Sequence, residues 1–183
     1  MKKWAVFTLT VGTILLYLLL RFSFSNSKQL LPSSATLSTT PIVFGKQYKT
    51  MDCTVDGSLP DRGCTPGAII DGATKEQICT PGNAKSVRNV PVELKKSVYE
   101  EYTIPFPQPK GAYEVDHLIS LELGGSNDIA NLWPEASDPR PGFHEKDMVE
   151  NYLHDQVCNG VISLQDAQQK ITEDWVHVYK TMQ

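Results

Sequence analysis

The sequence has no closely spaced pair of cysteines. Its four cysteines, Cys53, Cys64, Cys79 and Cys158, lie well apart, and no C-x-x-C pair occurs. Structural zinc sites usually draw their ligands from such pairs, so the spacing argues against a zinc staple. An even number of cysteines in an exported chain favours disulfides. Three pairings of four cysteines are possible, and the sequence does not choose among them.

An excess of basic residues is also absent. The chain has 17 Lys and Arg against 21 Asp and Glu, and three of its bases are Lys2, Lys3 and Arg21. The rest of the chain therefore carries 14 bases against 21 acids, a formal net charge of −7. This balance excludes a broadly basic surface that holds nucleic acid through its phosphates. A local basic cleft remains compatible with it.

Charged residues are missing from one long N-terminal run. Trp4 to Leu20 is uncharged and apolar, and Lys2 and Lys3 precede it. The length is close to that of a membrane-spanning helix, and the lysines predict a cytoplasmic N-terminus. We expect an uncleaved signal anchor over residues 1–21, because only Ser25–Ser27 weakly resembles a cleavage site; a cleaved signal peptide is the alternative. The domain then lies in the periplasm or outside the cell, membrane-anchored or secreted.

The remainder divides into a tether and a domain. Residues 22–50 are rich in Ser, Thr and Pro and read as a flexible tether. Residues 51–183 form the predicted exported domain, which begins with a turn-rich segment that contains "CTPG" twice. Helical spacing predicts helices over residues 91–102 and 143–158. A third helix is expected after Ser163, which forms a capping pair with Asp166.

Between the first two helices the pattern changes to that of strands. The stretch "YEVDHLISLELGGSNDIANLWPE" predicts a strand from residue 113 to about 120 or 123, a bend at Gly124-Gly125, and a second strand near residues 131–133. The residues "PEASDPRPGF" then predict a loop. The fold class is therefore α+β, with few strands and three helices.

This hairpin carries the residues best suited to chemistry. Hydrolysis of a phosphodiester needs a base for water and a cation that offsets charge on the phosphate. A neutral His is the natural base near pH 7, and Asp oxygens and His nitrogens bind divalent cations. Asp116 and His117 are adjacent on the predicted first strand, so their side chains point to opposite faces. His144 opens the following helix, with Asp147 and Asn151 on the same side.

The segments "VDHLISLELGGSNDIANLW" and "HEKDMVEN" resemble the HNH endonucleases, also called the His-Me finger or ββα-metal family, and in particular its exported bacterial members. The resemblance implies a ββα-metal core over about residues 113–158, with extra helices before and after it and disulfides bracing it. It implies that His117 is the general base, that Asp116 and His144 bind the metal, and that Asn131 fixes the loop backbone and the orientation of the base. Asn127, in the loop, is the less favoured candidate for the last role.

The expected activity is metal-dependent cleavage of nucleic acid, with DNA the favoured substrate. The expected cofactor is one divalent cation, Mg²⁺ first and Mn²⁺ or another transition ion as alternatives. Arg88 is a candidate phosphate contact, since Arg binds phosphate bidentately, although a structural ion pair explains it equally well. Lys146 is a second candidate for binding nucleic acid, although with Asp147 and Glu150 it also reads as a solvated face.

Two rival functions stay open at this point. The first is an envelope-anchored binding module that keeps the ββα shape without catalysis. The second is a toxin-like effector that acts on the DNA of another cell and needs an immunity partner. No protein partner can be deduced from the sequence, whereas the apolar run implies the membrane as a partner.

Overall fold

A computed structural model of the chain describes residues 44–182. The predicted signal anchor or signal peptide and most of the tether lie outside the described residues. Within residues 44–182, no helix is both long enough and apolar enough to cross a membrane.

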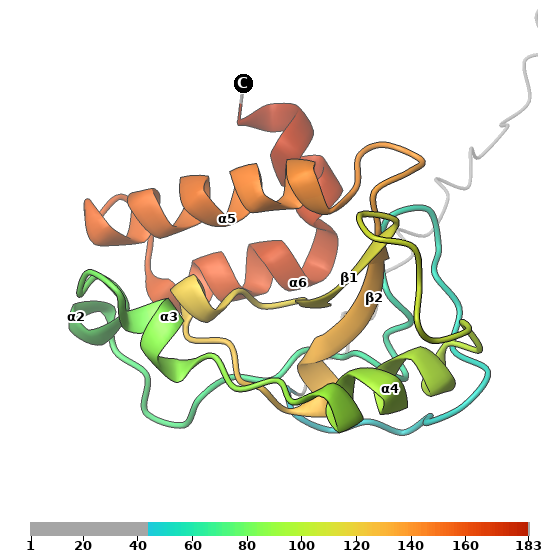
Figure 1. The fold of residues 1–183 in the computed structure, drawn as a ribbon. Helices are drawn as coiled ribbons and strands as arrows, with labels where there is room; N and C mark the ends of the chain where they lie inside the picture. The colour runs from blue at the N-terminus through green and yellow to red at the C-terminus, as the bar shows by residue number, and fades with distance from the viewer. Residues whose placement is uncertain (1–43, 183) are drawn as a thin grey trace, which may run out of the picture. The chain divides into compact units, whose positions relative to one another are not determined.

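The strands form a two-stranded antiparallel hairpin (Figure 1). Strand β1 spans Tyr113–His117 and strand β2 spans Leu132–Ala136, with Asp116 opposite Trp133 and His117 opposite Leu132. The α+β class is confirmed, but the predicted strand bounds are wrong. β1 ends before Leu118, and β2 continues through Pro134 into the segment predicted as a loop. Pro134 is tolerated because a two-stranded sheet consists of edge strands, which can lack a donor.

The connection between the strands is longer than a tight bend. It contains two 3₁₀ turns, η1 at Leu121–Leu123 and η2 at Ile129–Asn131. Gly124 ends η1 with a φ of +73°, and a Cβ on Gly125 would lie 1.8 Å from the carbonyl oxygen of Ile119. The glycine pair is therefore required for a close backbone approach inside the loop, and it is not the bend of the hairpin itself.

The long helices agree closely with the sequence patterns. Helix α4 spans Val92–Glu101, α5 spans Phe143–Cys158 and α6 spans Leu164–Thr181. The predicted capping pair at the start of α6 is confirmed: the Ser163 hydroxyl accepts from the Asp166 N–H, and the Asp166 carboxylate accepts from the Ser163 N–H. Pro91 is the N-cap of α4 and not its first helical residue.

Two short helices stand where the sequence predicted only turns or gave no element. Helix α2 spans Lys75–Ile78 and starts at a Thr74–Gln77 capping box, and α3 spans Asn83–Val87. Each is a single turn or little more, too short for helical periodicity to reveal. Together they place the segment after α3 beside the hairpin loop, since α3 and η1 pack against each other.

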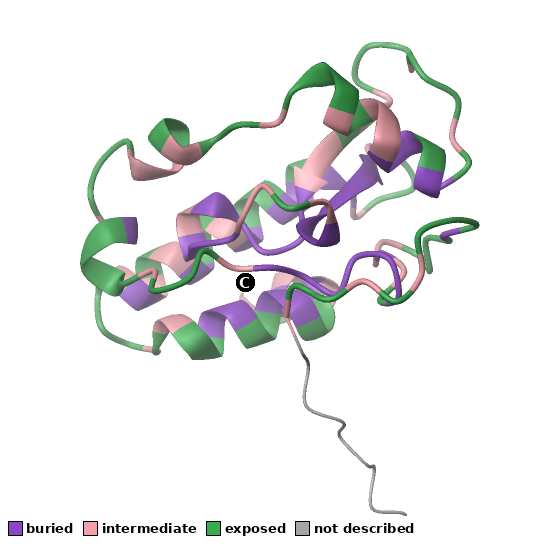
Figure 2. Cartoon of the chain, turned by 90° about the horizontal axis from the view of Figure 1, so that it is seen from below, coloured by how far each residue is buried: buried purple, intermediate pink, exposed green. Residues whose placement is uncertain are grey.

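The helices cover the hairpin from different sides (Figure 1). Helix α5 packs against α6 and against β1, whereas α4 packs against β2. The core between α5, α6 and the hairpin loop is apolar, and the inward faces of these elements are buried (Figure 2). Its fully buried members include Ile119, Val149, Ile171 and Trp175.

Both cysteine pairs form disulfides, as the sequence predicted. Cys53 bonds Cys64, 11 residues away, and Cys79 bonds Cys158, 79 residues away. The second bond joins the C-cap of α2 to the last residue of α5. The bracing of the ββα segment by covalent links is therefore present in the structure.

Candidate active site

His117 is the last residue of β1, and its ring is held by one hydrogen bond. Nε2 lies 3.1 Å from Oδ1 of Asn127. The Asn127 amide is itself oriented, because its Nδ2 donates to the carbonyl of Val87 at 2.7 Å and its Oδ1 accepts from the N–H of Asn89 at 3.0 Å. An amide oxygen only accepts, so Nε2 of His117 carries the proton. The basic lone pair of the neutral ring is therefore on Nδ1.

This Nδ1 atom has no hydrogen-bond partner among the described residues and is closed to solvent. Burial lowers the pKa of His117 to about 4, although the neighbouring Asp116 carboxylate opposes the shift. The ring is consequently neutral at pH 7. A buried, unpartnered lone pair is costly in a protein interior and points to a functional use.

The Asp116 side chain points to the opposite face, towards α5, where it forms an ion pair with Lys146. The Lys146 ammonium donates to Oδ2 of Asp116 at 2.8 Å, to the carbonyl of His117 at 2.7 Å, and to Glu150. The Lys146 side chain is 0% exposed. The prediction of a solvated or substrate-binding Lys146 is therefore wrong: all three of its donors are used inside the protein.

The charges of this group are interdependent. Burial would raise the pKa of Asp116, but the Lys146 ammonium outweighs it and the pKa falls below its usual range. Burial likewise opposes the charge of Lys146, and Asp116 and Glu150 together raise its pKa. For Glu150, burial prevails and raises the pKa to about 7. The ion pair between Asp116 and Lys146 is thus stable over the neutral pH range.

Two further polar side chains on β2 are buried beside this group. Glu135 is 1% exposed, and neither carboxyl oxygen has a hydrogen-bond partner among the described residues. Burial, and after it the Asp116 carboxylate, raise the pKa of Glu135 well above its ordinary value, against the opposing effect of Lys146. The burial of Glu135 therefore favours its neutral form. The indole N–H of Trp133 is also buried without a partner.

Asn131 is a structural residue of the hairpin loop. Its Oδ1 accepts from the N–H groups of Ile119 and Ala68, and its Nδ2 donates to the carbonyls of Ile119 and Ser126. These four bonds fix the loop backbone, as the resemblance implied. The His117 ring, however, is oriented by Asn127 and not by Asn131. No local pattern indicates that Asn127 holds the ring, because its backbone partners, Val87 and Asn89, lie about 40 residues away in the chain.

His144 stands in the first turn of α5 and is exposed. It lies near two carboxylates, Glu114 and Asp147, whose pKa values it lowers. Both pKa values are nevertheless raised, first by burial and then by the charge of Asp116. The three carboxylates therefore repel one another at the open side of the site. Arg88, in the segment after α3, is exposed, and its charge lowers the pKa values of Glu114 and Asp147.

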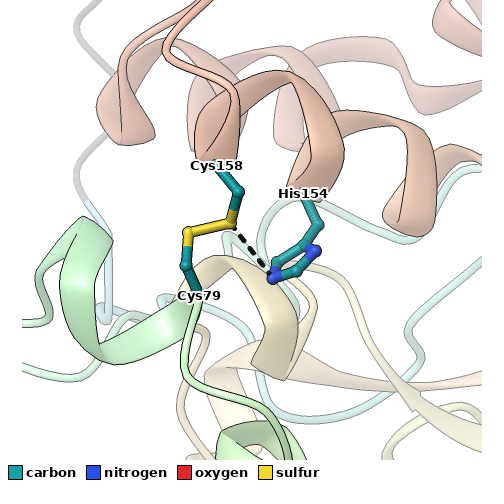
Figure 3. A group of neighbouring side chains, drawn as sticks. All are labelled: Cys79, His154 and Cys158. Atoms are coloured by element: carbon teal, nitrogen blue, oxygen red, sulfur yellow. Dashed lines mark hydrogen bonds between the residues drawn. A yellow bond between two sulfur atoms is a disulfide. The ribbon is translucent and has the colours of Figure 1, made fainter.

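One Cys–His–Cys group among the described residues could hold a metal ion. The potential ligand atoms of Cys79, His154 and Cys158 lie within 4.8 Å of one another (Figure 3). Two of these atoms are the sulfurs of the Cys79–Cys158 disulfide, and the third, Nε2 of His154, is 3.1 Å from the carbonyl of Ile78. A metal needs thiolates, so this group becomes a ligand set only when the disulfide is reduced.

Comparison with known proteins adds no relative. No protein-family model matches the chain, and neither the curated proteins nor the solved structures contain a match. The resemblance to HNH endonucleases therefore rests on the motif residues of the sequence.

Proposed function

We propose that the domain is a metal-dependent endonuclease of the HNH type, which hydrolyses phosphodiester bonds outside the cytoplasm. One observation carries the proposal: Asn127 fixes the tautomer of His117 so that its basic Nδ1 is free, at the end of a strand whose preceding residue is a carboxylate. A general base needs this combination of a neutral ring, a fixed orientation and an unused lone pair.

In this proposal His117 takes a proton from water at Nδ1. The ring stays neutral until then, because burial keeps its pKa low. Lys146 holds Asp116 and the backbone of His117 in place from α5, and it touches no substrate because it is fully buried. Substrate binding has to open the site, since Nδ1 is closed to solvent before substrate arrives.

The residues fit a hydrated Mg²⁺ better than a fully ligated transition ion. Burial and the charge of Asp116 raise the pKa values of Glu114 and Asp147, which lie near the exposed His144, so a cation at this point would relieve the repulsion among these carboxylates. No three of the described His, Cys, Asp or Glu ligand atoms other than Cys79, His154 and Cys158 lie within 4.8 Å of one another. Mg²⁺ usually needs only one or two carboxylates and keeps its waters. When bound, it would neutralise charge on the phosphate and the leaving oxygen.

A cleavage assay with a matched histidine control tests the proposal. We expect the chain to cut plasmid DNA, single-stranded DNA or RNA in the presence of Mg²⁺ or Mn²⁺. We expect His117→Ala to lower the rate at least a hundredfold, since general bases contribute about 10²–10⁴-fold. His177→Ala, which changes an exposed histidine of α6, should keep the full rate. Absence of cleavage with every metal, or equal cleavage by His117→Ala, contradicts the proposal.

A binding module without catalysis is the second candidate. Two observations favour it: Nδ1 of His117 is closed to solvent, and the Lys146 ammonium already binds the Asp116 carboxylate, which a metal would need. The two functions separate in one experiment: a module should bind nucleic acid and leave it intact with any metal, and His117→Ala should not alter its binding.

A further inference from the structure

A cleft runs along α4 on the side of the hairpin away from α5. Its volume is about 560 Å³, within the usual range for ligand clefts. It lies between α4, the start of β1 and the Pro-rich segment that joins them, and its lining includes Glu114 and Val115 of β1. These two residues directly precede Asp116 and His117 on β1.

The cleft is basic although the chain as a whole is acidic. Arg88, Lys95 and Lys110 line it, against the single carboxylate of Glu114. All three cations are exposed, and none belongs to an ion pair within residues 44–182. Their neighbour Lys96, by contrast, is paired with Glu93. Three unpaired cations along one hollow match the charge of a polyanion.

Aromatic rings form part of the same wall. Phe106 is 42% exposed and lies 5.5 Å, between ring centroids, from the buried Tyr99. Tyr99 in turn meets Tyr113 edge-on at 6.4 Å. The Phe106 ring is therefore packed against Tyr99, which Tyr113 supports in turn, while part of the ring stays exposed in the cleft. An exposed, supported ring beside cations is the arrangement that stacks an unpaired base.

We propose that this cleft binds the substrate as a single strand, with a base stacked on Phe106 and the backbone phosphates on Arg88, Lys95 and Lys110. The inference rests on the proposed function, because it names the substrate class of that site. A duplex hides the faces of its bases and cannot use the Phe106 ring. The acidic remainder of the domain would also repel the second strand of a duplex.

Arg88 connects this cleft to the catalytic residues. It also lines a second cleft, of about 350 Å³, together with Lys85, Asp147 and Glu150. The first cleft is thus basic and aromatic, whereas the second has three acids, Glu122, Asp147 and Glu150, against two bases. A strand that lies in the first cleft passes Arg88 before its phosphate reaches the carboxylates, so Arg88 is placed to hold the phosphate next to the cleaved one.

Fluorescence anisotropy with the full-length chain in detergent micelles tests the inference. The probes are labelled 12-nucleotide oligo-dT and oligo-rU and a DNA duplex of the same length, all in EDTA, with a gel to verify that they stay intact. We expect either single strand to bind at least tenfold more tightly than the duplex. Phe106→Ala should weaken binding about tenfold, since stacking of one base contributes that order.

Charge variants provide the second readout. Lys95→Gln and Lys110→Gln should each weaken binding and reduce the slope of log Kd against log salt by about 0.7. The matched controls are Lys96→Gln, which changes the paired neighbour on α4, and Tyr48→Ala, which removes an exposed ring outside the cleft. Both controls should bind within twofold of the parent.

The outcomes separate the two proposals. Equal or tighter duplex binding, or cleft variants that behave like the controls while circular dichroism shows them folded, overturns the inference. A preference for oligo-dT or for oligo-rU upholds it and assigns the sugar. Single-strand binding without cleavage under any metal leaves the cleft standing and refutes the nuclease. If Phe106→Ala and Lys95→Gln cut plasmid DNA as fast as the parent does, the nuclease is upheld and the binding role of the cleft is refuted.

Discussion

The two faces of β1 differ in whether their polar side chains have hydrogen-bond partners. Asp116 points into a group of charges in which every ammonium donor of Lys146 has a partner. His117, one residue later, points to the other face and keeps one nitrogen without any partner among the described residues. The alternation of a strand produces this separation, because neighbouring side chains leave on opposite sides.

The difference indicates a division of labour. The Asp116 face holds β1 against α5, since Lys146 bonds both the carboxylate and the adjacent backbone carbonyl. The His117 face holds a ring in one orientation without using its lone pair. A buried charge group that is fully paired supports the structure, whereas a buried base that is unpaired costs stability and suggests function.

The largest expected effect comes from breaking the Asp116 face. Lys146→Met keeps most of the volume but leaves Asp116 and Glu150 buried without their cation, and this should lower the free energy of unfolding by about 4 kcal/mol. Urea denaturation followed by circular dichroism measures it. Adding Asp116→Asn and Glu150→Gln should recover a large part of the loss. A Lys146→Met domain within about 1 kcal/mol of the parent would mean that the charge group does not support the fold.

The His117 face should give a pH-dependent effect. The folded pKa of His117 is about 4, below its ordinary value of 6.5, so between these values the unfolded chain binds a proton that the folded one does not. The contribution of His117 to stability is therefore full above pH 6.5 and falls by about 3 kcal/mol as the pH drops to about 4. Glu150, whose pKa burial raises to about 7, contributes with the opposite sign, because the folded chain then holds a proton that the unfolded chain has lost. The lowered pKa of Asp116 acts only below this window.

Urea midpoints measured from pH 4 to pH 7 check this effect. His117→Asn should lose the His117 contribution, because its amide does not titrate, so its stability should fall less between pH 7 and pH 4 than that of the parent. His177→Asn, on the exposed side of α6, should retain the slope of the parent. Identical slopes for the parent and His117→Asn would show that the ring is not held neutral by the fold.

The smallest effects distinguish the two asparagines. Asn131→Ala removes four hydrogen bonds from buried loop groups and should cost about 2 kcal/mol of stability. Asn127→Ala should cost only about 1 kcal/mol, yet it frees the His117 ring to change tautomer and should lower the cleavage rate more strongly than Asn131→Ala does. Parallel denaturation and cleavage assays compare the two. The same ratio of activity to stability in both variants would contradict separate roles.

The parts of the fold that the sequence predicted are those with local signals. The bounds of α5 follow from its helical spacing and from the Asn159-Gly160 stop, and the start of α6 follows from Ser163 and Asp166. The disulfide pairing required the tertiary structure, because nothing along the chain brings Cys79 near Cys158. Helices α2 and α3 are too short to produce a periodic pattern.

The candidate site was predicted in its residue types but not in its contacts. Asp116, His117 and Asn131 stand out because they lie within one motif. The burial of Lys146 could not be read from the sequence, since a lysine beside acids on a helix usually faces solvent, and only the position of Asp116 across the fold explains it. The role of Asn127 depends on Val87 and Asn89, whose approach to the loop is a tertiary contact.

The Cys79–Cys158 disulfide also bears on the order in which the domain matures. The two cysteines are 79 residues apart in the sequence, and every candidate site residue from Arg88 to Glu150 lies in the loop between them. In the chain-entropy account, closing a loop of this size stabilises the folded state by about 4–5 kcal/mol, because it lowers the conformational entropy of the unfolded chain. Cys158 is synthesised after all of those residues, so the covalent loop closes only when most of the polypeptide has left the ribosome. The oxidation that forms this bond therefore follows synthesis of the last candidate site residue.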